Sequence, residues 1–221
     1  MIAPAVRIVK LGGSLLDLAD VQQRLCRWVA DQPAMINAVV VGGGAAVESL
    51  RLRDRADGSV HRDSADLHWL AVRLMNRNMR RMARGIPGAQ TVWQVDAVRR
   101  AARGGLVFLD SLRILNRFDR SPHISSLPWD WSVTSDSIAA ALAKLLAATE
   151  LTLLKSTTPA DCRDWRDAAD QGYVDAYFPT AVDGVEFAYG VNLRDRSAAR
   201  WRPVSQTGPP ADSGPHALPS P

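Results

Sequence analysis

VRIVKLGGS, at residues 6–14, is a mostly apolar run rich in β-branched side chains that ends at two glycines. Such a run is typical of a strand buried in a sheet, and the glycines mark a tight loop after it. The same unit recurs at residues 38–41, which read AVVV and precede three glycines at 42–44. Helical patterns follow the two loops, at residues 20–31 and 45–53. The alternation predicts βα units in a parallel sheet.

The pattern continues along the chain as far as residue 193. Further helices are predicted at residues 64–84, 96–103, 134–148 and 160–171, and further strands at 91–95, 106–109, 151–154 and 185–193. The composition then changes, because residues 203–221 hold six prolines and no apolar periodicity. We therefore expect one domain over residues 1–202 and a disordered, proline-rich tail over residues 203–221.

Composition narrows the class of protein. A 221-residue chain that is 47% hydrophobic has enough apolar side chains for one sizeable core. Its net charge of +4 comes from arginines spread along the chain, which argues against a nucleic-acid partner. No apolar run has the length of a membrane span, and the segment before Lys10 is not typical of a signal peptide. With Cys26 and Cys162 in no metal-binding or disulfide pattern, we expect a cytoplasmic protein.

Lysine is scarce in this chain. Only Lys10, Lys144 and Lys155 are lysine, against 24 arginines. A compact, flexible point charge is what lysine offers and arginine does not, so the lysines that remain are candidates for chemistry. A genome biased towards arginine explains the same count without any function.

The first loop combines features that suit a phosphate group. Lys10 supplies charge at the end of a strand, and Gly12 and Gly13 let backbone N–H groups approach closely before Ser14. The loop is not a P-loop, because no Gly-x-x-x-x-Gly-Lys-Ser/Thr pattern occurs. A glycine pair after a strand is also a common structural turn.

The second loop, Gly42, Gly43 and Gly44, repeats this arrangement before a helix. We expect it to bind a phosphoryl group in transfer, or the molecule that accepts that group, through N–H groups at the helix N-terminus. The alternative is a flexible connector without a function.

Two charged residues occupy positions that suit a ligand site. Asp136 follows Thr134 and Ser135 in the first turn of a predicted helix, where an acidic residue is favourable even without a function. Lys155, followed by Ser156, ends a predicted strand, and open α/β sheets bind ligands beyond the carboxyl ends of their strands. The alternative for Lys155 is a strand-end residue that faces water.

In this order and spacing, the motifs resemble those of the amino acid kinase family. They are VKLGGS at 9–14, VVGGG at 40–44, TSD at 134–136 and LLK at 153–155. The family includes acetylglutamate, aspartate, uridylate and isopentenyl phosphate kinases, and the resemblance extends over residues 6–193. It implies a three-layer αβα sandwich with a mostly parallel central sheet.

One stretch is similar to a narrower branch of that family. Residues 127–140, LPWDWSVTSDSIAA, resemble the kinases that act on aminomethyl-furanmethanol phosphate in methanofuran biosynthesis. The resemblance implies ATP as donor, Mg²⁺ as cofactor, a small anionic acceptor such as a phosphomonoester, and a homo-oligomer.

The resemblance also implies roles for individual residues. Lys10 would neutralise charge on the transferring group, Asp136 would orient Lys10 and help place Mg²⁺, and Lys155 would contact the nucleotide phosphates. The remaining residues divide into a nucleotide side (Gly12, Gly13, Ser14 and Ser156) and an acceptor side (Gly42, Gly43, Gly44, Arg62, Asp66, Thr134 and Ser135).

The chain departs from the family after Lys155. Ser156-Thr157-Thr158-Pro159 stands where relatives have threonine followed by Asp-Val-Asp-Gly, and no later lysine matches their second catalytic lysine. Either Lys155 or an arginine replaces that lysine, or catalysis is impaired. An acyl-phosphate-forming kinase and a non-catalytic nucleotide or oxyanion binder are therefore alternatives.

Overall fold

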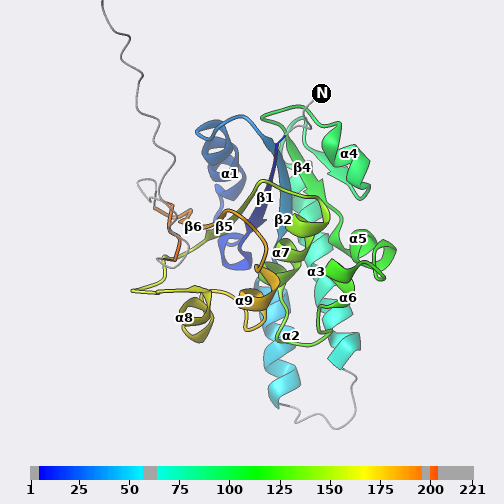
Figure 1. Cartoon of the computed structure of the whole chain (residues 1–221), viewed down its shortest axis with the longest axis vertical. Helices are drawn as coiled ribbons and strands as arrows, with labels where there is room; N and C mark the ends of the chain where they lie inside the picture. Colours follow the sequence, from blue (N-terminus) through cyan, green and yellow to red (C-terminus); the bar gives the residue numbers. More distant parts are fainter. Residues whose placement is uncertain (1–4, 57–63, 196–199, 204–221) are drawn as a thin grey trace, which may run out of the picture.

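A computed structural model describes residues 5–56, 64–195 and 200–203 (Figure 1). The strands of this part of the chain form one sheet of six, all parallel, in the order β3-β4-β2-β1-β5-β6. Their bounds are β1 Val6–Leu11, β2 Ile36–Val41, β3 Gln90–Val92, β4 Leu106–Leu109, β5 Glu150–Lys155 and β6 Ala188–Asn192. The predicted parallel α/β sheet is therefore confirmed. Apart from Pro203, the predicted tail lies outside the described residues.

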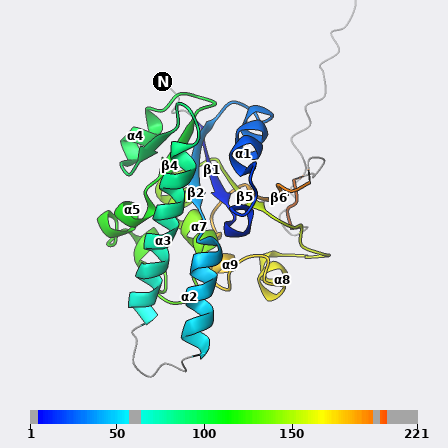
Figure 2. The ribbon, with the colours of Figure 1, turned by 180° about the vertical axis from the view of Figure 1, so that it is seen from behind.

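Helices cover both faces of the sheet, as a three-layer sandwich requires (Figures 1 and 2). On one face, α7 packs in a cluster with α4, α5, α6 and α9, while α1 and the second half of α3 cover the other face. Helix α2 and the first half of α3 lie side by side and project beyond the carboxyl edge of the sheet. The bounds are η1 Gly13–Leu15, α1 Val21–Ala30, α2 Gly44–Ala56, α3 Ser64–Arg84, α4 Val95–Arg99, α5 Ser111–Arg117, α6 Pro122–Ser125, α7 Ser135–Leu145, α8 Trp165–Asp170 and α9 Phe178–Ala181.

The alternation of side chains along β1 and β5 decides where the lysines point. Ile8 packs in the cluster on the α7 face, whereas Val9 packs in the cluster of α1 and α3. Because successive strand residues face opposite sides, Lys10 shares the α7 face with Ile8. On β5, Leu153 packs on the α7 face, so Lys155, two residues later, lies on that face as well.

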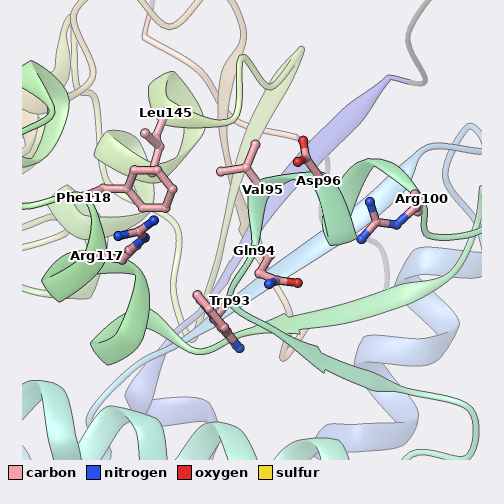
Figure 3. A pocket seen from close by; sticks show the side chains of 8 residues that line it. All are labelled: Trp93, Gln94, Val95, Asp96, Arg100, Arg117, Phe118 and Leu145. Carbon is pink, nitrogen blue, oxygen red and sulfur yellow. The ribbon is translucent and has the colours of Figure 1, made fainter.

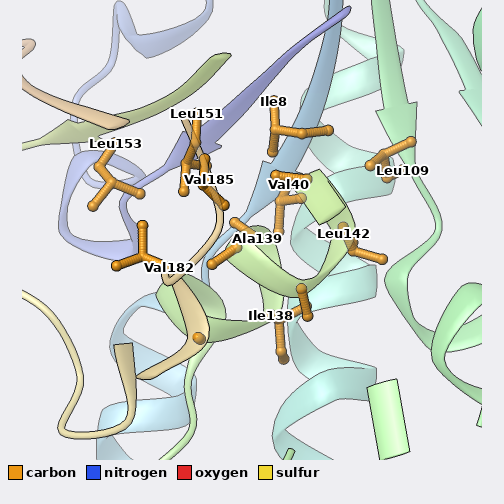
Figure 4. Close-up of a cluster of buried hydrophobic side chains, with 14 of the residues drawn as sticks. Ile8, Val40, Leu109, Ile138, Ala139, Leu142, Leu151, Leu153, Val182 and Val185 are labelled. Carbon is orange, nitrogen blue, oxygen red and sulfur yellow. The ribbon is translucent and has the colours of Figure 1, made fainter. Parts of the chain in front are cut away.

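Helix α7 is buried along nearly its whole length and forms the centre of this cluster. Figure 4 shows Ile138, Ala139 and Leu142 of α7 in one cluster with Ile8 and Leu151 of the sheet. Complete burial of one Leu or Ile side chain stabilises a fold by about 1.5–3 kcal/mol, so this packing fixes the helix firmly. Its first turn is thereby held at the carboxyl edge of the sheet.

Some elements differ from the sequence-based expectations. The predicted strand 91–95 ends at Val92, because a helix already begins at Val95. The predicted helix 160–171 is shorter, since the carboxylate of Asp164 accepts the backbone N–H groups of Arg166 and Asp167 and starts the helix there. In the described part of the chain, no helix has both the length and the apolar character that crossing a membrane requires.

Candidate functional site

Two glycine bends meet at the carboxyl edge of the sheet. A Cβ atom on Gly13 would lie 2.3 Å from the backbone nitrogen of Gly44, and one on Gly42 would lie 2.6 Å from that of Gly13. No real side chain fits such distances, so the bends that follow β1 and β2 approach each other only because both are made of glycine. This is the edge where open α/β sheets bind ligands.

The glycines of these bends do not all have free N–H groups. Gly12 donates to the carbonyl of Leu154 at 2.8 Å, and Gly42 donates to that of Leu11 at 2.9 Å. Both bonds continue the ladder of the sheet, so the expectation that Gly12 donates to a phosphate is wrong. Among the described residues, the N–H groups of Gly13 and Gly43 have no acceptor. They are the backbone donors that a ligand can use.

The second bend is held in place by a side chain that the sequence analysis missed. Asn78 of α3 donates to the carbonyls of Gly42 and Gly43, at 3.1 and 2.9 Å. Gly44 has a φ of 61°, a left-handed conformation that glycine adopts without strain. No pattern around Asn78 indicates this role, because its partners lie on a different element.

A carboxylate between two ammonium groups forms the centre of the site. Lys10 Nζ lies 2.8 Å from Asp136 Oδ1, and Lys155 Nζ lies 2.8 Å from Asp136 Oδ2. The three side chains are 5%, 12% and 6% exposed for Lys10, Lys155 and Asp136. Lys155 therefore does not face water. Among these three side chains two cations face one anion, a balance that favours an anionic ligand.

The pKa values of this group follow from burial and from the neighbouring charges. Burial alone raises the pKa of Asp136, but the charges of Lys10 and Lys155 outweigh it and hold the value at about 2. Burial and, to a smaller extent, the charge of Lys10 lower the pKa of Lys155 to about 8, against the opposing effect of Asp136. At neutral pH, Asp136 is thus ionised and Lys155 carries its proton.

A second carboxylate, Asp175, fixes the start of α7. It accepts hydrogen bonds from the backbone N–H groups of Thr134 and Ser137, at 2.9 and 3.0 Å, and from both hydroxyls. Thr134 is the N-cap residue, yet its own side chain makes no capping bond, so Asp175 acts in its place. Burial raises the pKa of Asp175, and the charge of Asp136 adds to this. Sequence reasoning missed Asp175.

The structure brings together two residues that were predicted for the nucleotide side. Ser14 Oγ donates to Ser156 Oγ at 3.0 Å, joining the bend after β1 to the end of β5. Both therefore lie beside the lysines on the same edge of the sheet.

The acceptor-side predictions are brought together only in part. Ser135 is buried in the first turn of α7. Asp66 is exposed in the first turn of α3, and no hydrogen bond or ion pair joins it to another described residue of the site. Arg62 lies outside the described residues.

The segment before α7 contacts α2 through an aromatic residue. Trp131 Nε1 donates to Asp54 at 2.7 Å, and the guanidinium of Arg51 lies 5.2 Å from the centre of the Trp131 ring. These contacts join α2, which begins at the second glycine bend, to the segment that leads into Asp136. They fix the position of this segment relative to α2.

The described residues do not build a metal site. No cluster of three or more His, Cys, Asp or Glu side chains with a geometry for a metal occurs among them. Asp136 does not fit as a Mg²⁺ ligand, because each of its oxygens already lies 2.8 Å from an ammonium group that would repel a cation. The expected metal role of Asp136 therefore lacks support from the geometry.

A cavity of about 830 Å³ lies away from this group (Figure 3). Leu145, at the last turn of α7, contributes to its lining together with Trp93, Arg117 and Phe118. Asp136 stands in the first turn of the same helix, so this cavity and the charged group lie at opposite ends of α7.

Comparison with known proteins supports the fold. No family model and no curated protein sequence matches this chain. Solved structures do match: the uridylate kinase of Archaeoglobus fulgidus is 13% identical with a TM-score of 0.54, covering 83% of this chain and 88% of that one.

Two bacterial structures are equally similar. The UMP kinase of Ureaplasma parvum is 11% identical with a TM-score of 0.54, covering 88% of this chain and 92% of its own. That of Bacillus anthracis is 12% identical with a TM-score of 0.55, covering 89% and 90%. At these identities the likeness concerns the fold. The chain has the amino acid kinase fold of these UMP kinases.

Proposed function

We propose that this chain is an ATP-dependent phosphotransferase that transfers the γ-phosphoryl group to a small anionic acceptor. One observation carries the proposal: Asp136 is held between Lys10 and Lys155 where two glycine bends meet. A buried carboxylate with two ammonium groups is an expensive arrangement for stability alone, because each ion loses its hydration. Binding of an anionic ligand at this edge explains why the chain keeps these buried charges.

Phosphoryl transfer needs alignment and charge stabilisation more than it needs covalent chemistry. An acceptor oxygen attacks the γ-phosphorus of ATP, the bond to the β,γ-bridging oxygen breaks, and ADP leaves. Lys10 offsets negative charge on the transferring group, while Asp136 fixes the direction of the Lys10 ammonium. The free N–H groups of Gly13 and Gly43 contact the phosphates from the two bends. An anionic acceptor arrives without its proton, so the site needs no general base.

Lys155 is the candidate for the role of the second lysine. It lies at the end of β5 on the same face as Lys10, and it reaches the other oxygen of Asp136. We propose that it offsets charge on the nucleotide phosphates beside Ser14 and Ser156. Mg²⁺ enters as part of the ATP complex, bound to the phosphates of that substrate.

A phosphomonoester is the proposed acceptor, and the product is a diphosphate. Aminomethyl-furanmethanol phosphate follows from the similarity of residues 127–140 to that branch, and UMP follows from the names of the similar structures. We further propose a cytoplasmic homo-oligomer, as the family resemblance implies. An amino acid acceptor and binding without turnover are the alternatives.

The test is ATP consumption with a panel of acceptors. UMP and aminomethyl-furanmethanol phosphate represent phosphomonoesters, and aspartate and N-acetylglutamate represent carboxylates. Lys10→Met should abolish turnover, whereas Lys144→Met is a matched control, since Lys144 lies in the last turn of α7. Binding of ATP without turnover for every acceptor would support a binder, and equal turnover by Lys10→Met would contradict the proposed mechanism.

A further inference from the structure

We propose that residues 200–203 hold Lys155 in position through Tyr173, so that Trp201 and Tyr173 are positioning residues for the proposed phosphotransfer. The inference depends on the proposed function for its kinetic part. Its structural part, the placement of the Lys155 ammonium, is tested separately.

Tyr173 is the second partner of Lys155, after Asp136. The ammonium of Lys155 donates to the backbone carbonyl of Tyr173 at 2.6 Å and lies 5.1 Å from the centre of its ring. With Asp136 at 2.8 Å, these contacts surround the ammonium with one charge, one carbonyl and one aromatic face. A flexible four-carbon stem does not hold such a position alone, least of all beside the like charge of Lys10. The position of Lys155 therefore depends on that of Tyr173.

The ring of Tyr173 is confined between β6 and the C-terminal segment. A Cβ atom on Gly190 would lie 2.2 Å from Tyr173 Oη, so the ring rests directly on the backbone of β6. Trp201 meets the ring edge-on, with centroids 5.6 Å apart and planes at 73°. Tyr173 Oη is buried without a hydrogen-bond partner among the described residues. The backbone N–H of Tyr173 donates to the carbonyl of Ala168 at 2.9 Å, and packing of the ring, not its hydroxyl, holds the side chain.

Trp201 is itself anchored to β6. Its backbone N–H donates to the carbonyl of Gly190, and the N–H of Gly190 donates back, both at 2.7 Å. Its ring also packs edge-on against Trp165, with centroids 5.1 Å apart. The segment thus adds an antiparallel contact at the edge strand of the sheet.

Arg200 ties the same segment to the opposite end of β5. Its guanidinium donates to Glu150 Oε2 at 3.0 Å and to Gln32 Oε1 at 2.5 Å. Glu150 also accepts from the fully buried Arg7 at 2.6 Å. Lys155 ends the strand that Glu150 begins, so the segment is fixed at one end of β5 and acts on the other through Trp201 and Tyr173.

The first test compares Trp201→Ala with a matched aromatic control. Trp93 is also half-buried, but it lines the cavity at the other end of α7, so Trp93→Ala loses aromatic packing without touching Tyr173 or the partners of Arg200. We expect Trp201→Ala to lower kcat about 10-fold or more with little change in acceptor KM, because a misplacement near 1 Å is enough to slow a reaction about 100-fold. Trp201→Phe should retain most of kcat, and Trp93→Ala should leave kcat unchanged.

The second test reads the position of Lys155 without any turnover. Lys10, Lys144 and Lys155 are the chain's three lysines, so amine acetylation followed by peptide mass spectrometry reports each of them. Lys155 should react several-fold faster in Trp201→Ala than in the wild type, relative to Lys144, and should not do so in Trp93→Ala. If the wild type were inactive but Lys155 still reacted faster in Trp201→Ala, the proposed function would be wrong and the positioning of Lys155 would be supported.

Substitutions on two other elements separate positioning from folding. Gly190→Ala pushes against the Tyr173 ring and should expose Lys155 in the same way, whereas Tyr173→Phe keeps the ring and should label like the wild type. If Trp201→Ala and Gly190→Ala both leave the labelling of Lys155 unchanged in a folded protein, the inference is wrong. It is equally wrong if Trp93→Ala exposes Lys155 as much as they do.

Discussion

Lys10 Nζ lies 2.8 Å from Asp136 Oδ1, although one residue stands on the first strand and the other opens the helix that covers it. Both side chains are almost fully buried. Lys155 Nζ contacts the other oxygen of the same carboxylate, so the Asp136 anion lies between two ammonium groups.

Asp136→Asn tests the central charge. It leaves two buried ammonium groups without their counter-ion, and we expect the free energy of unfolding to fall by about 3–5 kcal/mol, as for other broken buried ion pairs. Chemical denaturation measures this loss. Adding Lys155→Met to the same protein removes one of the two cations and should recover part of the stability, while phosphotransfer stays absent. If Asp136→Asn alone were as stable as the wild type, Asp136 would not be needed as the counter-ion of the two lysines.

The pKa of Lys155 predicts how activity depends on pH. Its value of about 8, against the usual 10.5, means that the ammonium loses its charge as the pH rises through 8, so kcat should fall there. Lys155→Arg keeps a charged group and should shift this descending limb to higher pH. If the fall in kcat occurred at the same pH in Lys155→Arg, a group other than Lys155 would be responsible for it.

The same shift has a defined sign for stability. Between pH 8 and 10.5 the unfolded chain binds more protons at Lys155 than the folded chain does. The contribution of Lys155 to the free energy of unfolding therefore increases with pH over that window.

Gly13→Ala tests the contact between the two bends. The added methyl group would lie 2.3 Å from Gly44 N, so the bends must separate, and ATP should bind at least about 10-fold more weakly, or about 1.4 kcal/mol. Titration calorimetry with ATP measures the change. Gly88→Ala is the matched control, because Gly88 has a φ of 76° and open space around its Cα. It should lose about 1–2 kcal/mol of stability through backbone strain and keep its affinity for ATP.

Asp175→Ala tests the residue that starts α7. It removes the acceptor of the N–H groups of Thr134 and Ser137, and we expect a loss of about 2–3 kcal/mol in the free energy of unfolding, together with slower turnover. Asp167→Ala removes a carboxylate that accepts the backbone N–H and the guanidinium of the exposed Arg163, and it should lower stability by less than about 1 kcal/mol. Equal effects of the two substitutions would show that Asp175 has no special role.

Much of the site was predictable because it depends on local patterns. Alternation along two apolar runs determines which face of the sheet carries Lys10 and Lys155, and glycines mark where each strand ends. The helix that begins near Asp136 has its own apolar periodicity. The fold and the position of the three charged residues at one edge follow from these features, whereas their roles in catalysis stay predictions.

Other expectations failed where a neighbouring element decided the outcome. Gly12 does not offer its N–H to a ligand, because the carbonyl of Leu154 on the adjacent strand already accepts it. Thr134 is the N-cap residue of α7, but its side chain makes no capping bond, and Asp175 accepts the N–H groups instead. In both cases the partner is distant in the chain, and no local pattern reveals it.

The sequence by itself predicted the alternation of strands and longer helices and the two glycine bends, since each depends on neighbours within a few residues, but it did not predict the short helices α5, α6 and α9. Only the tertiary structure decided that Asn78 holds the second bend, that Asp175 starts α7 and that Tyr173 contacts Lys155. Each of these contacts joins segments far apart in the chain. Their physical cause is the packing that brings the segments together, and that packing is a property of the whole fold.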